Sequence, residues 1–351
     1  MALYNRIDKN VLKERLMAEP FKRVTLSFYR YVIIDNVEDT RNALYQMWEA
    51  LGVFGRIYIA REGINAQLSV PEANFDAFKA QLYADERFSN VPFKIAVEDD
   101  GKSFYKLIVR VKSKIVADGL ADDTFDVTNV GTHLNAEEFN KALLQPGVVV
   151  VDMRNHYESE VGHFEGAICP DADTFKQELP MVVDMLKDKK DAPVVMYCTG
   201  GIRCEKASAY LKHSGFTNVS QLYGGIIEYA REVKNNGLDN KFRGKNFVFD
   251  ERLGERISDE IISKCHQCGT ACDDHTNCAN FECHLLFIQC KDCAGQYQGC
   301  CSAECKDIIN LPIDEQRKIR KGKEKPGDQR NIYKKGRLRP KLNEMVFTNN
   351  K

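Results

Sequence analysis

The sequence has no run of eighteen apolar residues, which excludes a membrane-spanning helix of the usual length. Its first sixteen residues contain six charged side chains, so we do not expect a secretory signal there. It also lacks internal repeats, a dinucleotide fingerprint and a clear facial triad of metal ligands, and we expect no flavin, haem or nicotinamide site. These absences predict a soluble, cytoplasmic protein without a membrane partner.

Length and charge distribution indicate several domains. The 351 residues are 43% hydrophobic, enough to bury more than one core, and we expect two or three domains. The net charge is only −1, but it is unevenly distributed. Residues 306–351 hold fourteen Lys or Arg and six Asp or Glu, a net of +8, which leaves −9 for residues 1–305. The C-terminal tail is basic and the body is acidic.

The first 118 residues are expected to form one domain. Strand-like runs at 24–34, 56–60, 64–70 and 92–97 alternate with helical spacing around 44–51 and 71–83. This βαββαβ order predicts a ferredoxin-like, acylphosphatase-like fold. Residues 104–115 alternate apolar and basic side chains. They predict either a half-buried strand with a solvated face or a ridge for nucleic-acid phosphates.

A second domain is expected at residues 127–238, after an acidic boundary at 118–126. Asn135 is followed three residues later by Glu138, a capping-box spacing that predicts a helix start. Continuous apolar runs at 148–151 and 193–197 predict strands buried on both faces, with helices at 175–186 and 205–213. The alternation predicts a parallel α/β sheet.

The loop after the second buried run carries the strongest chemical signal. Cys198 would lie at the carboxyl end of a parallel strand, where such sheets place their ligand sites. Gly200 and Gly201 let the backbone curl so that N–H groups point at one anion, and a helix begins near Arg203. The amides, the helix terminus and the guanidinium should lower the thiol pKa and favour a nucleophilic thiolate. The alternative is a buried structural cysteine at a tight turn.

Cys204 directly follows Arg203 and allows two interpretations. It could be a resolving thiol that reduces or accepts sulfur from Cys198. It could equally be a small apolar residue in the first helical turn, the usual role of a buried thiol.

The segment Cys198, Thr199, Gly200, Gly201, Ile202, Arg203 resembles the active-site loop of the rhodanese superfamily. Residues 148–168 and 222–226 are similar to two further motifs of that superfamily. The resemblance implies that Cys198 carries a persulfide and that Asp152 and Arg154 brace the loop. Related cysteine phosphatases have one residue more between Cys and Arg, so phosphatase activity is not expected.

Residues 263–308 contain ten of the thirteen cysteines and are expected to form a small metal-binding module. The pairs Cys265/Cys268 and Cys290/Cys293 have the two-knuckle spacing of a tetrahedral, structural zinc site. A second site could draw on Cys272, Cys278, Cys283, Cys300, Cys301 and Cys305. The alternative is a set of reduced thiols, or of disulfides formed on purification, but so polar a stretch has little core without a metal.

Residues 309–351 form a basic tail in which Gly and Pro are expected to break any helix. Such a tail could add salt-dependent affinity for nucleic acid, or it could be a solvated, disordered segment. The candidate RNA contacts are Lys318, Arg320, Lys321, Lys334, Lys335, Arg337 and Arg339.

The three modules in this order resemble the bacterial rhodanese-related tRNA uridine-34 hydroxylases. The similarity covers nearly the whole chain and includes residues 60–68, 194–206 and 265–305. It implies oxygen-dependent hydroxylation of the wobble uridine at carbon 5, with molecular oxygen as co-substrate, the tRNA anticodon loop as partner and Cys198 as the essential residue. A hairpin turn alone explains residues 61–65, although they could contact substrate.

The residues themselves do not explain how oxygen is activated, and the electron donor is unknown. With one activated thiol and no redox cofactor, a persulfide or sulfenic form of Cys198 could react directly. Alternatively, Cys198 could add to carbon 6 of uracil and make carbon 5 nucleophilic. His156 and Glu158 are interpreted as a polar surface.

Two rival functions stay open from the sequence. The Cys198 loop alone would suit a sulfurtransferase that carries a persulfide on Cys198. The chain could also be a zinc-stabilised binding or regulatory module with no chemistry of its own.

Overall fold

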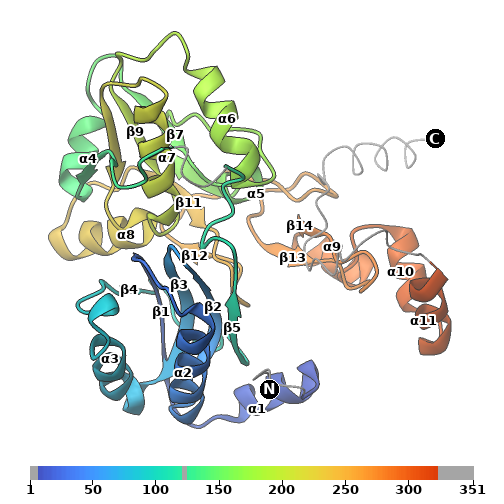
Figure 1. Ribbon diagram of the computed structural model, residues 1–351. Coiled ribbons are helices and arrows are strands. Elements are labelled where there is room, and N and C mark those ends of the chain that lie inside the picture. The colour runs from blue at the N-terminus through green and yellow to red at the C-terminus, as the bar shows by residue number, and fades with distance from the viewer. Residues whose placement is uncertain (1–6, 121–124, 323–351) are drawn as a thin grey trace.

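The computed structural model describes residues 7–120 and 125–322, and Figure 1 shows its arrangement. The N-terminal domain (blue) and the central domain (green to yellow) stack on each other, and the cysteine-rich module (orange) lies to one side. None of the described helices is long and apolar enough to cross a membrane.

The N-terminal domain has the expected βαββαβ order, and its ferredoxin-like, acylphosphatase-like fold is confirmed. Its sheet has the strand order β4-β1-β3-β2-β5, in which β5 lies parallel to β2. The elements are α1 (Lys9–Ala18), β1 (Arg23–Tyr31), α2 (Val37–Ala50), β2 (Phe54–Ala60), β3 (Gly63–Pro71), α3 (Phe75–Tyr83), β4 (Lys94–Ile95) and β5 (Leu107–Val111), with short 3-10 helices at Glu72–Asn74 and Glu86–Phe88.

Only one face of this sheet is covered by the domain's own helices. Leu26 and Phe28 of β1 point into a core with Trp48 of α2 and Phe78 of α3. Because side chains alternate along a strand, the intervening residues of β1 point to the opposite face. That open face is turned toward the central domain.

Strand β5 is shorter than the expected strand at 104–115. Leu107 and Val109 are buried against the core as the alternation predicts, but Val111 is 37% exposed because the strand ends there at the sheet edge. The half-buried strand is therefore confirmed only over Leu107–Val111.

The central domain is the expected parallel α/β domain. Its sheet has the order β6-β10-β9-β7, and every neighbouring pair is parallel. The capping box of Asn135 and Glu138 at the start of α4 is confirmed. The elements are β6 (Thr132–Leu134), α4 (Ala136–Ala142), β7 (Val149–Asp152), α5 (His156–Ser159), β8 (Gly162–Phe164), α6 (Phe175–Met185), β9 (Val194–Tyr197), α7 (Ile202–His213), β10 (Val219–Leu222) and α8 (Gly225–Asn236).

The cysteine-rich module is joined to the central domain by a small antiparallel sheet. Strand β11 pairs with β8 and with β12. The remaining elements are β11 (Phe242–Asn246), β12 (Glu255–Arg256), β13 (His275–Asn277), β14 (Leu286–Ile288), α9 (Lys291–Tyr297), α10 (Ala303–Ile309) and α11 (Ile313–Gly322).

Helix α11 corrects one expectation about the basic tail. The stretch that begins at Arg317 was expected to be broken by glycine, but it continues a helix that starts at Ile313 and runs to Gly322. A glycine at the last helical position lies where the backbone can leave the helix without strain, so it does not interrupt the turns before it.

Candidate active site between the two domains

Cys198 lies at the carboxyl end of β9, in the turn that leads into α7. Gly201 has φ of 93°, a conformation that favours glycine, and this turn directs its backbone N–H to Sγ of Cys198 at 3.1 Å. Gly200 does not have a positive φ angle. Of the two glycines, therefore, only Gly201 is required by its backbone conformation. The expected amide cradle around the sulfur is present.

The surroundings of Cys198 favour a thiolate. Burial opposes ionisation and is the largest single influence on this pKa. The Cys204 thiol, the charge of Arg203 and the backbone amides of Cys204 and Arg203 together outweigh it and lower the pKa of Cys198 to about 6. A cysteine with such a pKa is mostly ionised at neutral pH and can act as a nucleophile.

Arg203 is held by a carboxylate whose place in the sequence had indicated a polar surface. Its guanidinium donates two hydrogen bonds to Glu158, at 2.7 and 2.8 Å, and a longer one to Thr199 Oγ1 at 3.3 Å. Glu158 is fully buried, so the surface interpretation is wrong for this residue. Its role was missed because the partner lies 45 residues away in the sequence.

Asp152 and Arg154 form a buried pair beside the loop. Arg154 donates to both carboxylate oxygens of Asp152, at 2.8 and 2.6 Å, and to the carbonyl of Gly162 at 2.6 Å. Asp152 is paired across the sheet with Tyr197, the residue before Cys198. The pair thus links the end of β7 to β8 next to the strand that delivers Cys198.

The loop is also fastened from α8. The backbone N–H groups of Ile226 and Ile227 donate to the carbonyls of Cys198 and Thr199, at 3.0 and 3.2 Å. A Cβ on Gly225 would lie 2.5 Å from the carbonyl oxygen of Cys198, so only glycine fits there. This contact explains why the segment 222–226 belongs to the site.

Cys204 is fully buried in the first turn of α7, next to Cys198. Burial, then the hydrogen bond to Cys198 and the charge on that residue, raise the pKa of Cys204 well above its usual value. Cys204 therefore keeps its proton and serves as a hydrogen-bond donor to the Cys198 thiolate. Its contact with Cys198 is compatible with either of the roles considered from the sequence.

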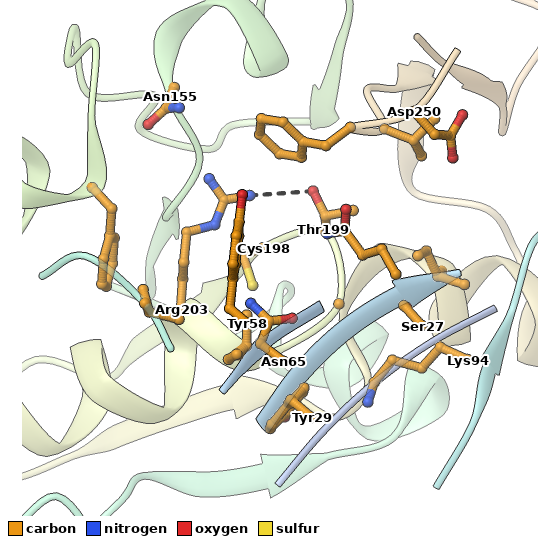
Figure 2. A pocket seen from close by; sticks show the side chains of 18 of the residues that line it. Ser27, Tyr29, Tyr58, Asn65, Lys94, Asn155, Cys198, Thr199, Arg203 and Asp250 are labelled. Carbon is orange, nitrogen blue, oxygen red and sulfur yellow. Dashed lines mark hydrogen bonds between the residues drawn. The ribbon is translucent and has the colours of Figure 1, made fainter. Parts of the chain in front are cut away.

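A cavity of about 540 Å³ separates the Cys198 loop from the open face of the N-terminal sheet. Figure 2 shows Cys198, Thr199 and Arg203 opposite the blue strands that carry Ser27, Tyr29 and Asn65. Residues from the linker to the cysteine-rich module, including Asp250 and Arg252, complete the wall. A volume of this size accommodates a small ligand such as a nucleoside.

Direct contacts fix the two domains against each other. Tyr29 of β1 donates a hydrogen bond to Glu205 of α7 at 3.0 Å. Lys206, which is almost completely buried, bridges Glu62 at 2.8 Å and Asp118 at 2.6 Å. The expected β2–β3 hairpin turn at residues 61 and 62 is confirmed, and it additionally supplies this interdomain carboxylate.

Two groups of four cysteines could each hold a metal ion. Cys265, Cys268, Cys290 and Cys293 form one group, as the two-knuckle spacing predicts. The second group is drawn from the six candidates, as expected, and it consists of Cys278, Cys283, Cys301 and Cys305, without Cys272 and Cys300. Cys300 packs in the same small core as these four, and Cys272 packs in the core beside the first group, which spacing along the sequence could not reveal.

The geometry of both groups suits a tetrahedral ion. All ligand sulfurs of a group lie within 4.8 Å of one another, and three of the sulfur pairs are 3.6 to 3.8 Å apart. Sulfurs bound at about 2.3 Å to a tetrahedral zinc would be about 3.8 Å apart. Backbone N–H groups of Cys290 and Cys301 donate to the sulfurs of Cys265 and Cys278, at 3.4 Å each, as is usual around metal thiolates.

Most of the candidate RNA contacts lie outside the residues that the structure describes. Lys318 is exposed on α11, and the backbone of Arg320 and Lys321 belongs to the same helix. The other four, Lys334, Lys335, Arg337 and Arg339, lie outside the described residues.

The architecture defines a distinct class of protein. In this class an acylphosphatase-like sheet lies over the active-site loop of a rhodanese domain, and a cysteine-rich module follows. Residues 23–115 match the UPF0176 acylphosphatase-like domain, residues 135–232 the rhodanese-like domain and residues 243–306 the rhodanese C-terminal family.

Curated relatives identify the family. The tRNA uridine(34) hydroxylase of Leptospira interrogans is 57% identical over 343 residues, covering 98% of this chain and 93% of that protein. The tRNA uridine(34) hydroxylase of Salmonella arizonae is 55% identical over 341 residues, covering 97% of each chain. The chain therefore belongs to the tRNA uridine(34) hydroxylase family, as its motifs indicated.

Proposed function

We propose that this chain hydroxylates carbon 5 of uridine-34 in tRNA, using molecular oxygen, with Cys198 as the catalytic nucleophile. The observation that carries the proposal is a cysteine of lowered pKa that lines a nucleoside-sized cavity, in a chain whose curated relatives are named for this reaction. The nucleotide reaches the cavity from the anticodon loop, where bases can be presented unstacked. A tRNA substrate places the enzyme in the cytoplasm.

The chemistry follows from the nucleophile. The Cys198 thiolate adds to carbon 6 of the uracil ring, and the electron pair of the C5–C6 bond moves to the C4 carbonyl as an enolate. Carbon 5 then attacks dioxygen to form a hydroperoxide. An external two-electron donor reduces it to the C5 hydroxyl and water. Loss of the C5 proton expels Cys198 and restores the double bond, so that one oxygen atom enters the base and the other leaves as water.

The two cysteine groups hold zinc in this proposal. Four thiolates around one ion leave no open coordination position, so each zinc stabilises the module rather than reacting. The support is the sulfur geometry, together with the small size of the module's two cores, in which eight of the fourteen buried residues are cysteines.

The basic segment contributes affinity for tRNA. Lys318 is accessible on α11, and the six further lysines and arginines named above follow it in the sequence. Each that meets a phosphate releases counterions, so removal of residues 317–351 should weaken tRNA binding and reduce its dependence on salt.

The test is nucleoside analysis of tRNA incubated with the purified protein and a reductant, under air and under nitrogen. We expect 5-hydroxyuridine at position 34 only under air. A sulfurtransferase would instead add a thio group in the presence of a sulfur donor, regardless of oxygen. A binding module would leave the nucleoside unchanged, and either result would contradict the proposal.

A further inference from the structure

Lys94 is a largely buried lysine that lines the cavity and has no carboxylate partner among the described residues. It lies on β4 directly opposite Ser27 of β1, so its side chain shares the open face of the sheet that lines the cavity. It is 6% exposed, and its Nζ forms no hydrogen bond or ion pair with the part of the chain that the structure describes. A lysine with so little solvent around it and no partner is costly, which indicates that it is kept for function.

The other cationic lysine and arginine side chains of the cavity wall already have partners. Arg203 is bound to Glu158, and Arg252 to Asp250 and Glu255. Because Arg203 shares its charge with Glu158, a second cation beside the Cys198 thiolate would stabilise it further. Among the described residues that line the cavity, Lys94 is the ammonium or guanidinium group left to supply it.

Contacts hold Lys94 beside the Cys198 loop. Its Cδ is 3.6 Å from the place that a Cβ would occupy on Gly200, two residues after Cys198. Its Nζ lies 4.2 Å from the centre of the Tyr29 ring, and Figure 2 shows both side chains on the N-terminal strands below the loop. The ring face is an apolar surface that also attracts a cation, so it can hold the ammonium near the cavity without neutralising it.

We propose that Lys94 is a catalytic residue of this site: its ammonium balances the Cys198 thiolate and then donates a proton to O4 of the uracil as the sulfur adds to carbon 6. The substrate in this proposal rests on the proposed function. The N-terminal domain thus supplies a reacting group to the loop of the central domain, and neither domain contains the complete site.

Both the charge and the proton are accounted for in this step. The Sγ–C6 bond forms while the C5–C6 π bond breaks, and its electron pair moves through carbon 4 onto O4. The proton passes from Nζ to O4, which leaves a neutral amine and a neutral enol, and no oxidant or reductant is consumed. The enol is then the carbon-5 nucleophile that meets dioxygen.

The surroundings make the proton available near neutral pH. Burial lowers the pKa of Lys94 to about 8, while the charges of Cys198, Glu228 of α8 and Glu205 of α7 raise it in part. Of these groups, Glu205 accepts hydrogen bonds from Tyr29 and Gln221. Glu228 forms an ion pair with Arg231, in which Oε2 and Nη1 are 3.6 Å apart. An acid with a pKa close to the working pH transfers its proton more readily than an ordinary lysine.

The first test needs no tRNA. The rate at which iodoacetamide alkylates Cys198, followed by mass spectrometry of its peptide, reports the thiolate fraction. We expect Lys94→Met to raise the pKa of Cys198 by about one unit and slow alkylation at its former midpoint by about fivefold. Lys79→Met is the matched control, because Lys79 also lies over a tyrosine ring but is exposed on α3 and does not line the cavity. Equal alkylation rates in all three proteins would show that Lys94 does not stabilise the Cys198 thiolate.

The second test uses tRNA and separates chemistry from binding and folding. Lys94→Met should lower kcat for hydroxylation by about 100-fold and leave KM for tRNA within about twofold. Its melting temperature should equal or exceed that of the wild type, since an unpaired buried charge is removed. A change confined to KM, an unchanged kcat or a lower melting temperature would overturn the catalytic role. If the wild-type protein hydroxylates no tRNA, the proposed function fails, and the alkylation rates still decide the charge pairing.

Discussion

Cys198 and the eight cysteines of the two metal-ligand groups show what the same side chain does in two environments. Cys198 receives a backbone N–H, lies beside Arg203 and faces a cavity. The other eight face one another, sulfur to sulfur, with at least one further N–H donated to each group. An isolated thiolate next to a cavity is a nucleophile, whereas four converging thiolates are the ligand set of an ion. The direction in which the sulfur points therefore decides its chemistry.

The largest effect that separates the two environments is expected from Cys283→Ser. It removes one of four buried ligands, so the zinc content should fall from two ions per chain to one. The C-terminal module should lose its fold around that ion, because a structural zinc contributes about 10 kcal/mol or more in small domains. Zinc content by elemental analysis and protease sensitivity of the module are the measurements.

Cys300→Ser is the matched control for this variant. Cys300 is just as buried and directly precedes Cys301, but it lies outside both groups. It should retain two zinc ions. Equal zinc content in the two variants would show that the second group is not a metal site.

A smaller effect is expected at the Cys198 loop from Glu158→Gln. Removing the carboxylate leaves the buried guanidinium of Arg203 unpaired, which should lower the free energy of unfolding by about 3 kcal/mol. Glu137→Gln is the control, because its ion pair with Lys141 is exposed to solvent, and it should leave the unfolding curve unchanged. Urea unfolding followed by circular dichroism compares them. Superimposable curves for both variants would mean that the Glu158–Arg203 pair does not support the loop.

Local signals in the sequence predicted much of this molecule. The capping box spans only four residues, from Asn135 to Glu138, and the loop from Cys198 to Arg203 is contiguous, so both could be found without knowledge of the fold. Long-range partners could not. Glu158 acquires its role only when α5 is folded against α7. Lys94 lies on a two-residue strand whose position depends on pairing with β1.

The cysteine groups illustrate the same limit. The first group consists of two close pairs, and their spacing was sufficient to predict it. The second draws on ligands spread from Cys278 to Cys305, and several sets of four would fit such spacing equally well. Only the packing of β13, β14 and α10 selects one of them.

The smallest effect is the pH dependence that distinguishes the two kinds of cysteine. Alkylation of Cys198 should rise with pH through a midpoint at about 6 and then level off, because the thiolate is the reacting form. Since the folded protein lowers this pKa from 9.0, the thiolate's contribution to stability is fully present above pH 9 and is lost as the pH falls through about 6. Zinc-bound cysteines should remain unmodified across this range. A midpoint near 9 for Cys198 would mean that its surroundings do not activate it.

The role of the Cys198 thiolate is tested most directly by hydroxylation of tRNA under isotopically labelled dioxygen. The wild-type protein and Cys198→Ser are compared. The wild-type protein should place one labelled oxygen on carbon 5 of uridine-34. Cys198→Ser should place none, while both proteins retain two zinc ions and similar melting temperatures. Full incorporation by Cys198→Ser would contradict nucleophilic catalysis by Cys198, and oxygen that comes from water would contradict dioxygen as the source.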